Sequence, residues 1–387
     1  MDARVQIDDM LDAGYDAANG HASRTAVPAV CDVSVTNVCN AACDFCGFSR
    51  DRKLAGPRRY LELEAFRRAL PVMRRRRIRY LTFQGGEPLV HPQIVSLVAS
   101  ATQAGMQCGL ITNGWFLGRY VEPLAKAGLS RLLISIDSAE MAAHELNRGL
   151  SGLGARIRDG VAAARALGVP VCASVTVSRL VRYDALPDAL AALGFDCVSF
   201  SYPRRAPFGS TSLVYDEDSS LIDLSQDELI DALHQIASMK KRFRVLDPGA
   251  ALAEVERFVR GEAQRVPCIG GFKYFYVDWN LDIWRCEAWH EPMGSVFDLD
   301  SIPDRREPCN ACMMSCYRHA SVLMHGAICV TDAARALGDR HFADAVSTLF
   351  QQGVAYSLWA LAVDALPRRM LLRTARPRAH ADPSGRA

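Results

Sequence analysis

The stretch IRYLTFQGGEP, residues 78–88, joins an apolar, β-branched run to a polar turn. Its first nine residues have the composition of a buried strand, and polar residues follow directly where that strand would end. The same arrangement recurs along the chain, separated by helical patterns that often end in glycine. Six strand-like runs are expected, at residues 31–37, 78–86, 106–114, 131–138, 169–178 and 197–203.

This alternation predicts a parallel β/α sheet with right-handed crossovers. A doubly wound sheet and a partial barrel both satisfy it, but polar residues at successive strand ends favour the barrel, because barrel enzymes collect their chemistry at that face. We therefore expect an α/β fold, with a partial (β/α)6 TIM-like barrel over residues 31–245. A small cysteine-rich domain is expected over 246–331. Residues 1–30 would form an N-terminal extension, and 332–387 a C-terminal helical segment with a disordered basic tail.

The composition is that of a globular protein with a large core. The chain has 387 residues, of which 50% are hydrophobic and 23% charged, and its formal net charge is +2. This balance gives no sign of nucleic-acid binding, and global disorder is not expected. The opening residues are polar, and no run of about 20 apolar residues occurs, so neither a secretory signal nor a membrane span is expected. These features predict a cytoplasmic protein.

Thirteen cysteines are present. Without a secretory signal, clustered thiols more often hold metal than form disulfides. Four of them lie singly inside apolar strand-like runs and are expected to be small core residues. These four are Cys31, Cys108, Cys172 and Cys197.

Three further cysteines follow the first expected strand, in VCNAACDFC at residues 38–46. They are Cys39, Cys43 and Cys46. A tetrahedral zinc site would need a fourth Cys or His nearby, and the following GFSRDRKLAGPRR supplies neither. A cuboidal iron–sulfur cluster fits better, because three thiolates can hold it and leave its fourth iron open to another ligand.

This CxxxCxxC spacing, with the aromatic Phe45 before its third cysteine, resembles the radical S-adenosylmethionine superfamily. Motifs that end the following strands extend the resemblance over about residues 30–205. These motifs are GGEP (85–88), TNG (112–114) and SIDS (135–138), followed by NRG (147–149).

The resemblance implies that Cys39, Cys43 and Cys46 hold a [4Fe–4S] cluster whose open iron binds S-adenosylmethionine. An electron from the cluster would cleave this cofactor to a 5′-deoxyadenosyl radical, which abstracts a substrate hydrogen. The other implied cofactor-binding residues are Gly85, Gly86, Glu87 and Pro88 near the methionine amino group, Asn113 beside the adenosine, Ser135 and Asp137 at the ribose or methionine portion, and Arg148 at the methionine carboxylate. A turn cap for Asn113 and a helix-surface role for Arg148 remain open.

The cysteine-rich region carries a second resemblance, to the SPASM and twitch extensions of the same superfamily, which bind auxiliary [4Fe–4S] clusters. Leu281 stands where those extensions have glycine, and a CxxCxxxC run replaces a longer one. One twitch-like cluster is expected on Cys268, Cys286, Cys309 and Cys312. Cys316 competes with Cys309 or Cys312 as a ligand. A structural zinc site is the alternative. The thiols are Cys268, Cys286, Cys309, Cys312 and Cys316.

The sequence leaves the substrate open. We expect oxidation, dehydrogenation or a related modification of a small molecule, sugar-like or lipid-like, with an electron donor such as flavodoxin or ferredoxin. Modification of a ribosomal peptide is the alternative, although only about 30 residues precede the first strand, where peptide-modifying members often carry a leader-binding domain. A non-catalytic iron–sulfur sensor or scaffold is the alternative from another class of function. The GGEP and SIDS motifs argue against it, because a sensor needs no cofactor pocket.

The segment LFQQGVAYSLWALAVDALPRRMLLR, residues 349–373, combines apolar side chains with arginines. An interfacial helix can have this composition, so a peripheral contact with the inner membrane face is one interpretation. A helix packed on the barrel is favoured, because Pro367 would kink a longer helix.

Overall fold

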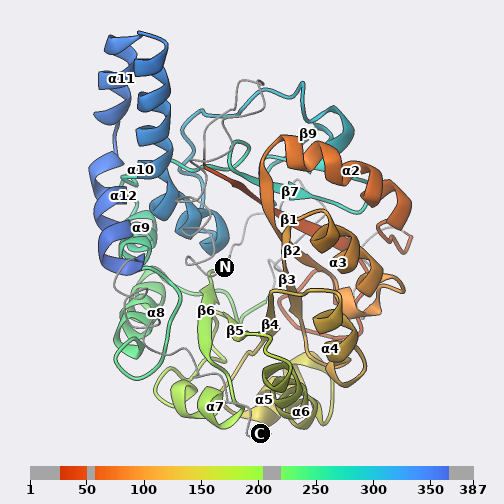
Figure 1. Cartoon of the computed structure of the whole chain (residues 1–387). Helices are drawn as coiled ribbons and strands as arrows, with labels where there is room; N and C mark the ends of the chain where they lie inside the picture. Colours follow the sequence, from red (N-terminus) through yellow and green to blue (C-terminus); the bar gives the residue numbers. More distant parts are fainter. Residues whose placement is uncertain (1–26, 50–56, 204–218, 366–387) are drawn as a thin grey trace, which may run out of the picture.

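The computed structural model describes residues 27–49, 57–203 and 219–365. Most of the expected N-terminal extension and the whole basic tail lie outside this described part. Within it, the chain forms one curved sheet with helices around its outer side (Figure 1).

Six parallel strands form the barrel wall, close to their expected positions. Each pairs in parallel with the next along the chain, so the sheet runs from β1 to β6 in sequence order. This confirms the expected α/β fold with a partial TIM-like barrel. The strands are β1 (Ala29–Thr36), β2 (Ile78–Gly85), β3 (Gln107–Thr112), β4 (Arg131–Ser135), β5 (Val171–Thr176) and β6 (Cys197–Ser201).

Helices follow the strands and cover the outer face of the sheet (Figure 1). Their apolar stripes face the strands and their polar residues face solvent, as in other α/β folds. They are α2 (Leu63–Arg75), η1 (Pro88–Val90), α3 (Ile94–Gln103), α4 (Leu117–Lys126), α5 (Met141–Arg148), α6 (Leu153–Ala166), α7 (Leu186–Ala192), α8 (Gln226–Met239) and α9 (Gly249–Val259).

The cysteine-rich region extends this same sheet. Strand β7 (Tyr274–Val277) pairs in parallel with β1, on the side away from β2. Strands β8 (Asp282–Trp284) and β9 (Pro292–Ser295) then continue as an antiparallel meander, and η2 (Val296–Asp298) follows. The sheet therefore has nine strands in the order β6-β5-β4-β3-β2-β1-β7-β8-β9. The expected domain boundary after residue 245 stays a prediction.

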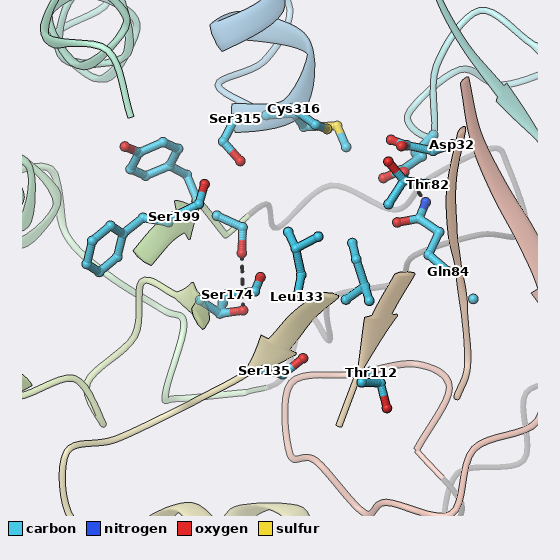
Figure 2. A pocket seen from close by; sticks show the side chains of 18 of the residues that line it. Asp32, Thr82, Gln84, Thr112, Leu133, Ser135, Ser174, Ser199, Ser315 and Cys316 are labelled. Carbon is cyan, nitrogen blue, oxygen red and sulfur yellow. Dashed lines mark hydrogen bonds between the residues drawn. The ribbon is translucent and has the colours of Figure 1, made fainter. Parts of the chain in front are cut away.

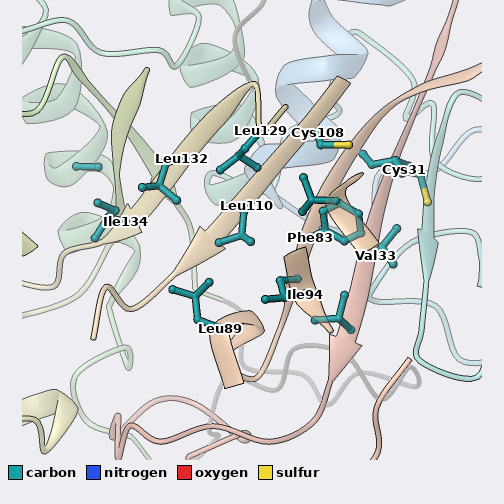
Figure 3. Packing of buried hydrophobic residues seen from close by; sticks show 14 of the residues in the cluster. Cys31, Val33, Phe83, Leu89, Ile94, Cys108, Leu110, Leu129, Leu132 and Ile134 are labelled. Carbon is teal, nitrogen blue, oxygen red and sulfur yellow. The ribbon is translucent and has the colours of Figure 1, made fainter. Parts of the chain in front are cut away.

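Side chains alternate between the two faces of the barrel strands. Outward residues such as Val33, Phe83 and Leu110 pack with helix residues in the main hydrophobic core (Figure 3). Inward residues such as Asp32 and Ser174 line a cavity inside the barrel. A packed barrel interior is normally filled by branched apolar side chains. Polar residues at these positions mark the lumen as a functional chamber. The four isolated cysteines of the strands are buried, as expected.

One long helix, α10 (Ser315–Gly338), begins beside the lumen and runs beyond the sheet together with α11 (Phe342–Leu349) (Figure 1). The chain then returns as α12 (Val354–Ala360) and η3 (Leu361–Ala365). Helix α12 packs against α10 and α9. The Gly326 amide donates to Ser357 Oγ at 2.7 Å, and Tyr356 Oη donates to the Ala250 carbonyl at 3.1 Å.

The segment expected to contact a membrane is described only in its first part. Residues 349–365 comprise the end of α11, a turn, α12 and η3, and Pro367 lies outside the described residues. No helix in the described ranges is long and apolar enough to cross a membrane.

Candidate active site in the barrel lumen

The cavity inside the barrel has a volume of about 260 Å³. The strand ends surround it, and the first turn of α10 closes one side through Ser315 and Cys316 (Figure 2). Of the eleven barrel residues that the sequence assigned to the cluster or the cofactor, all except Pro88 and Asp137 line this cavity. These lining residues are Cys39, Cys43, Cys46, Gly85, Gly86, Glu87, Asn113, Ser135 and Arg148.

The three cysteines of the first motif lie on the loop that follows β1. The end of β2 hydrogen-bonds this loop on one side, where the Gly86 amide donates to Thr36 and the Glu87 amide donates to Val38, both at 2.8 Å. The loop therefore starts as an extension of the β1–β2 pair. Its entry into the lumen is fixed by main-chain contacts, which do not depend on side-chain identity.

Two other elements hydrogen-bond the same loop further along. From the end of β3, Asn113 Nδ2 donates to Asn40 Oδ1 at 2.8 Å. From the end of α5, the Arg148 carbonyl accepts from the Ala42 amide at 2.8 Å. The GGEP, TNG and NRG motifs thus share a structural task, because all three position the cysteine loop.

The thiols of this loop are largely enclosed. Burial, with added repulsion from Glu87, raises the pKa of Cys39, and burial raises the pKa of Cys43 to about 12. Both are therefore protonated thiols in the absence of a bound cation, and a cluster would have to displace these protons. Three cavity-lining thiols on one fixed loop fit the thiolate set of a cuboidal cluster with one open iron. In the described ranges, no three Cys, His, Asp or Glu side chains meet at the spacing of a single metal ion.

The two glycines of GGEP have a structural role that was not expected from the sequence. A Cβ at Gly85 would overlap the Thr36 carbonyl, and a Cβ at Gly86 would overlap the Val38 carbonyl. Gly85 also has a φ of +126°, which side chains rarely tolerate. The two glycines let the backbone of β2 approach the cysteine loop itself. Their expected contact with the methionine amino group remains a prediction.

Replacing Gly86 with alanine is expected to displace the cysteine loop. The added methyl group has no space beside Val38, and the obstacle is main chain that cannot rotate away. We expect a loss of about 1–3 kcal/mol in the free energy of unfolding, as for other overpacked sites, together with reduced iron incorporation. Chemical denaturation and iron analysis measure both. Gly118→Ala on α4 is the control, because nothing lies within 4 Å of its Cβ position. Equal behaviour of the two variants would contradict this role.

Glu87 is held entirely by its surroundings. Its carboxylate accepts hydrogen bonds from the Leu89 amide at 2.9 Å and from Thr112 Oγ1 and the Asn113 amide at 2.7 Å. Burial raises the pKa of Glu87, although these donors oppose the shift. Pro88 is the first residue of η1 and is buried beneath the cavity wall. The carboxylate therefore joins the ends of β2 and β3 while lining the cavity.

Asp137 and Arg148 form a buried ion pair. Arg148 Nη2 lies 2.6 Å from Asp137 Oδ1, and Nε lies 2.9 Å from Oδ2. His144 and Asn147 contact the same carboxylate, at 3.4 and 2.8 Å. Burial alone would raise the pKa of Asp137, but the Arg148 guanidinium and the His144 side chain together outweigh it and hold that pKa well below its usual range. Asp137 therefore orients Arg148 in the cavity wall and does not line the cavity itself.

Replacing Asp137 with asparagine is expected to cost about 3–5 kcal/mol at neutral pH, because it leaves a buried guanidinium without its counter-charge. The lowered pKa means that the stabilisation is present above pH 4 and is lost as the pH falls through the folded-state value. The variant should therefore lose stability less steeply in acid. Urea unfolding from pH 7 to pH 2 measures this, because the loss begins only below about pH 4. Glu122→Gln is the control, since its pair with Lys126 is exposed to solvent and contributes little to stability.

The second thiol group lies beside β7 and β8. Four of its five cysteines pack against one apolar cluster built around Tyr274 and Tyr317. Cys309 lies near enough to Cys268 to raise the pKa of that thiol, and Cys286 is likewise affected by Cys268 and Cys312. The four preferred thiols therefore share one region.

Cys316 differs from the other four thiols of this group. Of the five, only Cys316 lines the barrel cavity. Burial raises its pKa well above the usual range, and Glu287 and Asp32 add to this effect. Its thiol is therefore directed to the lumen, and it also interacts with Cys312 of the second group.

Leu281, which departs from the expected glycine, keeps a glycine-like backbone. Its φ is +65°, in the left-handed region. The side chain is buried, and the Leu281 carbonyl accepts a hydrogen bond from the Val296 amide at 2.8 Å. The turn between β7 and β8 therefore has the conformation that glycine favours, and burial of the leucine offsets the strain.

An acidic wall was not identified from the sequence. Tyr274 Oη donates to Asp32 Oδ2 at 3.0 Å, and Gln84 Nε2 donates to Glu287 Oε1. Burial raises the pKa of Asp32 to about 6 and that of Glu287 to about 8, where repulsion from Asp32 adds to the shift. The sequence signal that could have identified this wall is the charged Asp32 within the apolar run CDVSVT. Figure 2 shows Asp32 and Gln84 across the lumen from Ser174 and Ser199.

Comparison with known proteins was made once this geometry was established. Residues 33–185 match the model of the radical SAM superfamily. A GTP 3′,8-cyclase of Heliobacterium modesticaldum is 36% identical over 162 residues, which are 40% of this chain and 48% of that protein. An AdoMet-dependent heme synthase of Methanosarcina barkeri is 37% identical over 100 residues, 26% of this chain and 29% of that one. The chain spans about half the length of such relatives, or less.

Solved structures show the same fold at low sequence identity. Streptococcus suis SuiB bound to S-adenosylmethionine has a TM-score of 0.51 at 14% identity, over 67% of this chain and 60% of that chain. Native anSMEcpe with bound AdoMet has a TM-score of 0.52 at 14% identity, over 89% and 99% of the two chains. At this identity the likeness supports the barrel architecture and nothing more specific.

Proposed function

The chain carries a domain of the radical SAM superfamily over residues 33–185, and from this premise we propose that it cleaves S-adenosylmethionine reductively and modifies a small molecule in the barrel lumen. One observation carries the proposal. The thiols of Cys39, Cys43 and Cys46 line the same cavity as the strand-end residues expected to bind the cofactor. Cluster, cofactor and substrate would therefore share one enclosed space, which keeps water and stray hydrogen donors away.

The residues of the chain position this chemistry. Bound together, the cluster and S-adenosylmethionine supply a 5′-deoxyadenosyl radical able to remove a substrate hydrogen. Cys39, Cys43 and Cys46 would hold the cluster, and Arg148 would bind the methionine carboxylate. Because Asp137 fixes the guanidinium through Nε and Nη2, Arg148 has a single orientation toward the cavity. Glu87 keeps the loop and the end of β3 in place.

A small substrate suits the enclosure of the chamber. The strand ends and the first turn of α10 surround the cavity, which favours a compact molecule over a long chain beside the cofactor. A peptide segment remains the alternative substrate. We infer an oxidative outcome from the second thiol group, which would hold an auxiliary cluster able to accept the substrate electron. A flavodoxin or ferredoxin would supply the first electron. Cyclisation is the alternative reaction, as the names of the curated relatives suggest.

The proposed activity is tested by anaerobic incubation of the iron-reconstituted chain with S-adenosylmethionine and dithionite. We expect 5′-deoxyadenosine and methionine in equal amounts, detected by liquid chromatography and mass spectrometry. Omission of dithionite is the control and should leave the cofactor intact. An intact cofactor in the presence of the reductant, with the cluster fully assembled, would contradict the proposal and favour a non-catalytic scaffold.

A peripheral membrane contact through residues 349–373 is a secondary proposal. In its described part, Phe350 is 86% exposed and Trp359 is 53% exposed, and exposed aromatic residues are typical of interfacial segments. Co-sedimentation with anionic phospholipid vesicles tests it. The double variant Phe350→Ala/Trp359→Ala should bind less, and equal binding would contradict the contact.

A further inference from the structure

Five hydroxyl side chains form two rows across the lumen face of β4, β5 and β6. Ser135, Ser174 and Ser199 occupy directly paired positions on the three strands. One step further along, Thr176 pairs with Ser201, and their hydroxyl oxygens lie 3.3 Å apart. All five line the cavity. We call these five residues the hydroxyl shelf. Figure 2 shows Ser135, Ser174 and Ser199 below the first turn of α10.

The shelf is unusual for a barrel interior. The alternate, outward positions of the same strands hold buried apolar residues such as Ile134, Val175 and Val198, as a packed fold requires. Small hydroxyl residues on the inner face leave space and hydrogen-bonding capacity. Within the described residues, the hydroxyls of Ser174 and Ser199 make no hydrogen bond. The first row therefore offers donors and acceptors to a ligand in the cavity.

Apolar side chains lie on one side of the shelf, and a polar side chain of α10 lies on the other. Leu133, Cys172 and Cys197 form a small buried cluster on the inner face, two residues before the first row on each strand. On the opposite side, His319 of α10 lines the cavity. An apolar floor beneath paired hydroxyls suits a ligand that has both C–H faces and hydroxyl groups. Neighbouring strands lie about 4.8 Å apart, so one ligand hydroxyl can hydrogen-bond to two adjacent shelf residues.

His319 can serve as an additional acceptor. Its Nε2 lies 3.4 Å from Asp247 Oδ1 but makes no hydrogen bond. Asp247 is itself held by the Phe200 amide at 3.1 Å and Tyr202 Oη at 3.3 Å. Burial lowers the pKa of His319 to about 3, and the charges of Lys240 and Arg318 add to this effect. The imidazole is therefore neutral at physiological pH, with one donor and one acceptor nitrogen.

We propose that the hydroxyl shelf and His319 bind the hydroxyl groups of the substrate, which is an uncharged polyol of the sugar or cyclitol class. The proposal rests on the proposed function, because it names the substrate of that site. The Asp32 carboxylate across the lumen disfavours an anionic substrate. The ribose of S-adenosylmethionine is also a polyol and is the competing occupant. Ser135, at the end of the shelf toward the cofactor residues, marks the boundary between the two.

The test uses the iron-reconstituted chain with S-adenosylmethionine bound, titrated anaerobically with myo-inositol and with D-glucose. We expect saturable binding of at least one of them by calorimetry, and a rise in melting temperature. The double variant Ser174→Ala/Ser199→Ala should weaken this binding about tenfold or more, since each lost hydrogen bond leaves a ligand group unpaired. Its affinity for S-adenosylmethionine should change less than about twofold. His319→Leu should weaken the same binding.

Controls separate the possible outcomes. Ser151→Ala, at an exposed position before α6, should leave polyol binding unchanged, and n-hexanol should not compete. Absence of saturable binding by both polyols would overturn the proposal. An equal loss of S-adenosylmethionine affinity in the double variant would assign the shelf to the cofactor ribose, and would also overturn it. Failure of the proposed function is distinct, because the wild-type chain would then form no 5′-deoxyadenosine.

Discussion

Replacing Cys39, Cys43 or Cys46 singly with alanine is expected to abolish 5′-deoxyadenosine formation and to remove about four irons per chain. A cuboidal cluster with one open iron already uses only three protein ligands, so the loss of any one leaves an incomplete set. The loop itself should persist, because it is held by main-chain hydrogen bonds from Gly86, Glu87 and Arg148. Iron analysis, the visible spectrum and product quantification measure the effect.

The matched control is Cys108→Ala. Cys108 is a buried thiol like Cys43, but it lies within β3 and packs in the main hydrophobic core. We expect it to retain its iron and its cleavage activity, with a modest loss of stability. Retained cleavage in all three loop variants would exclude these thiols as the ligands of the cleavage cluster. Loss of iron in Cys108→Ala as well would indicate general unfolding.

The barrel strands were predictable because they combine short apolar runs with regular spacing. Strand β2 was expected at 78–86 and is observed as Ile78–Gly85. The continuation of the sheet into β7, β8 and β9 was not predicted. These strands have only four, three and four residues, too few for a periodic signal. The pairing of β7 with β1 joins residues more than 240 positions apart. No local sequence pattern predicts such a pairing.

The site was predictable where chemistry depends on motif residues and not where it depends on register. Spacing located the cysteine loop and the strand-end motifs. The hydroxyl shelf needed the pairing of Ser135, Ser174 and Ser199 on three strands. His319 reaches the lumen only because α10 packs beside β6. The tight approach of Gly86 to Val38 likewise appears only in three dimensions.

The triple variant lacking Cys39, Cys43 and Cys46 is expected to retain about four irons after reconstitution with iron and sulfide. The second thiol group has four cysteines of its own in one region beside β7 and β8, so it needs no ligand from the first loop. Iron and zinc analysis with electron paramagnetic resonance of the reduced protein measures this. Zinc, or no metal, in place of iron would contradict an auxiliary cluster and weaken the case for an oxidative outcome.

In the background of that triple variant, Cys316 decides how the second cluster is held. Its thiol lines the lumen, whereas those of Cys268, Cys286, Cys309 and Cys312 do not. We expect Cys316→Ala to keep the iron, whereas alanine at Cys286 should remove it, since four thiolates fill every position of a cuboidal cluster. A cluster so coordinated leaves no open iron, and it would accept an electron without binding the substrate directly. Loss of iron in Cys316→Ala would instead place that thiol among the ligands and bring the auxiliary cluster to the wall of the substrate chamber.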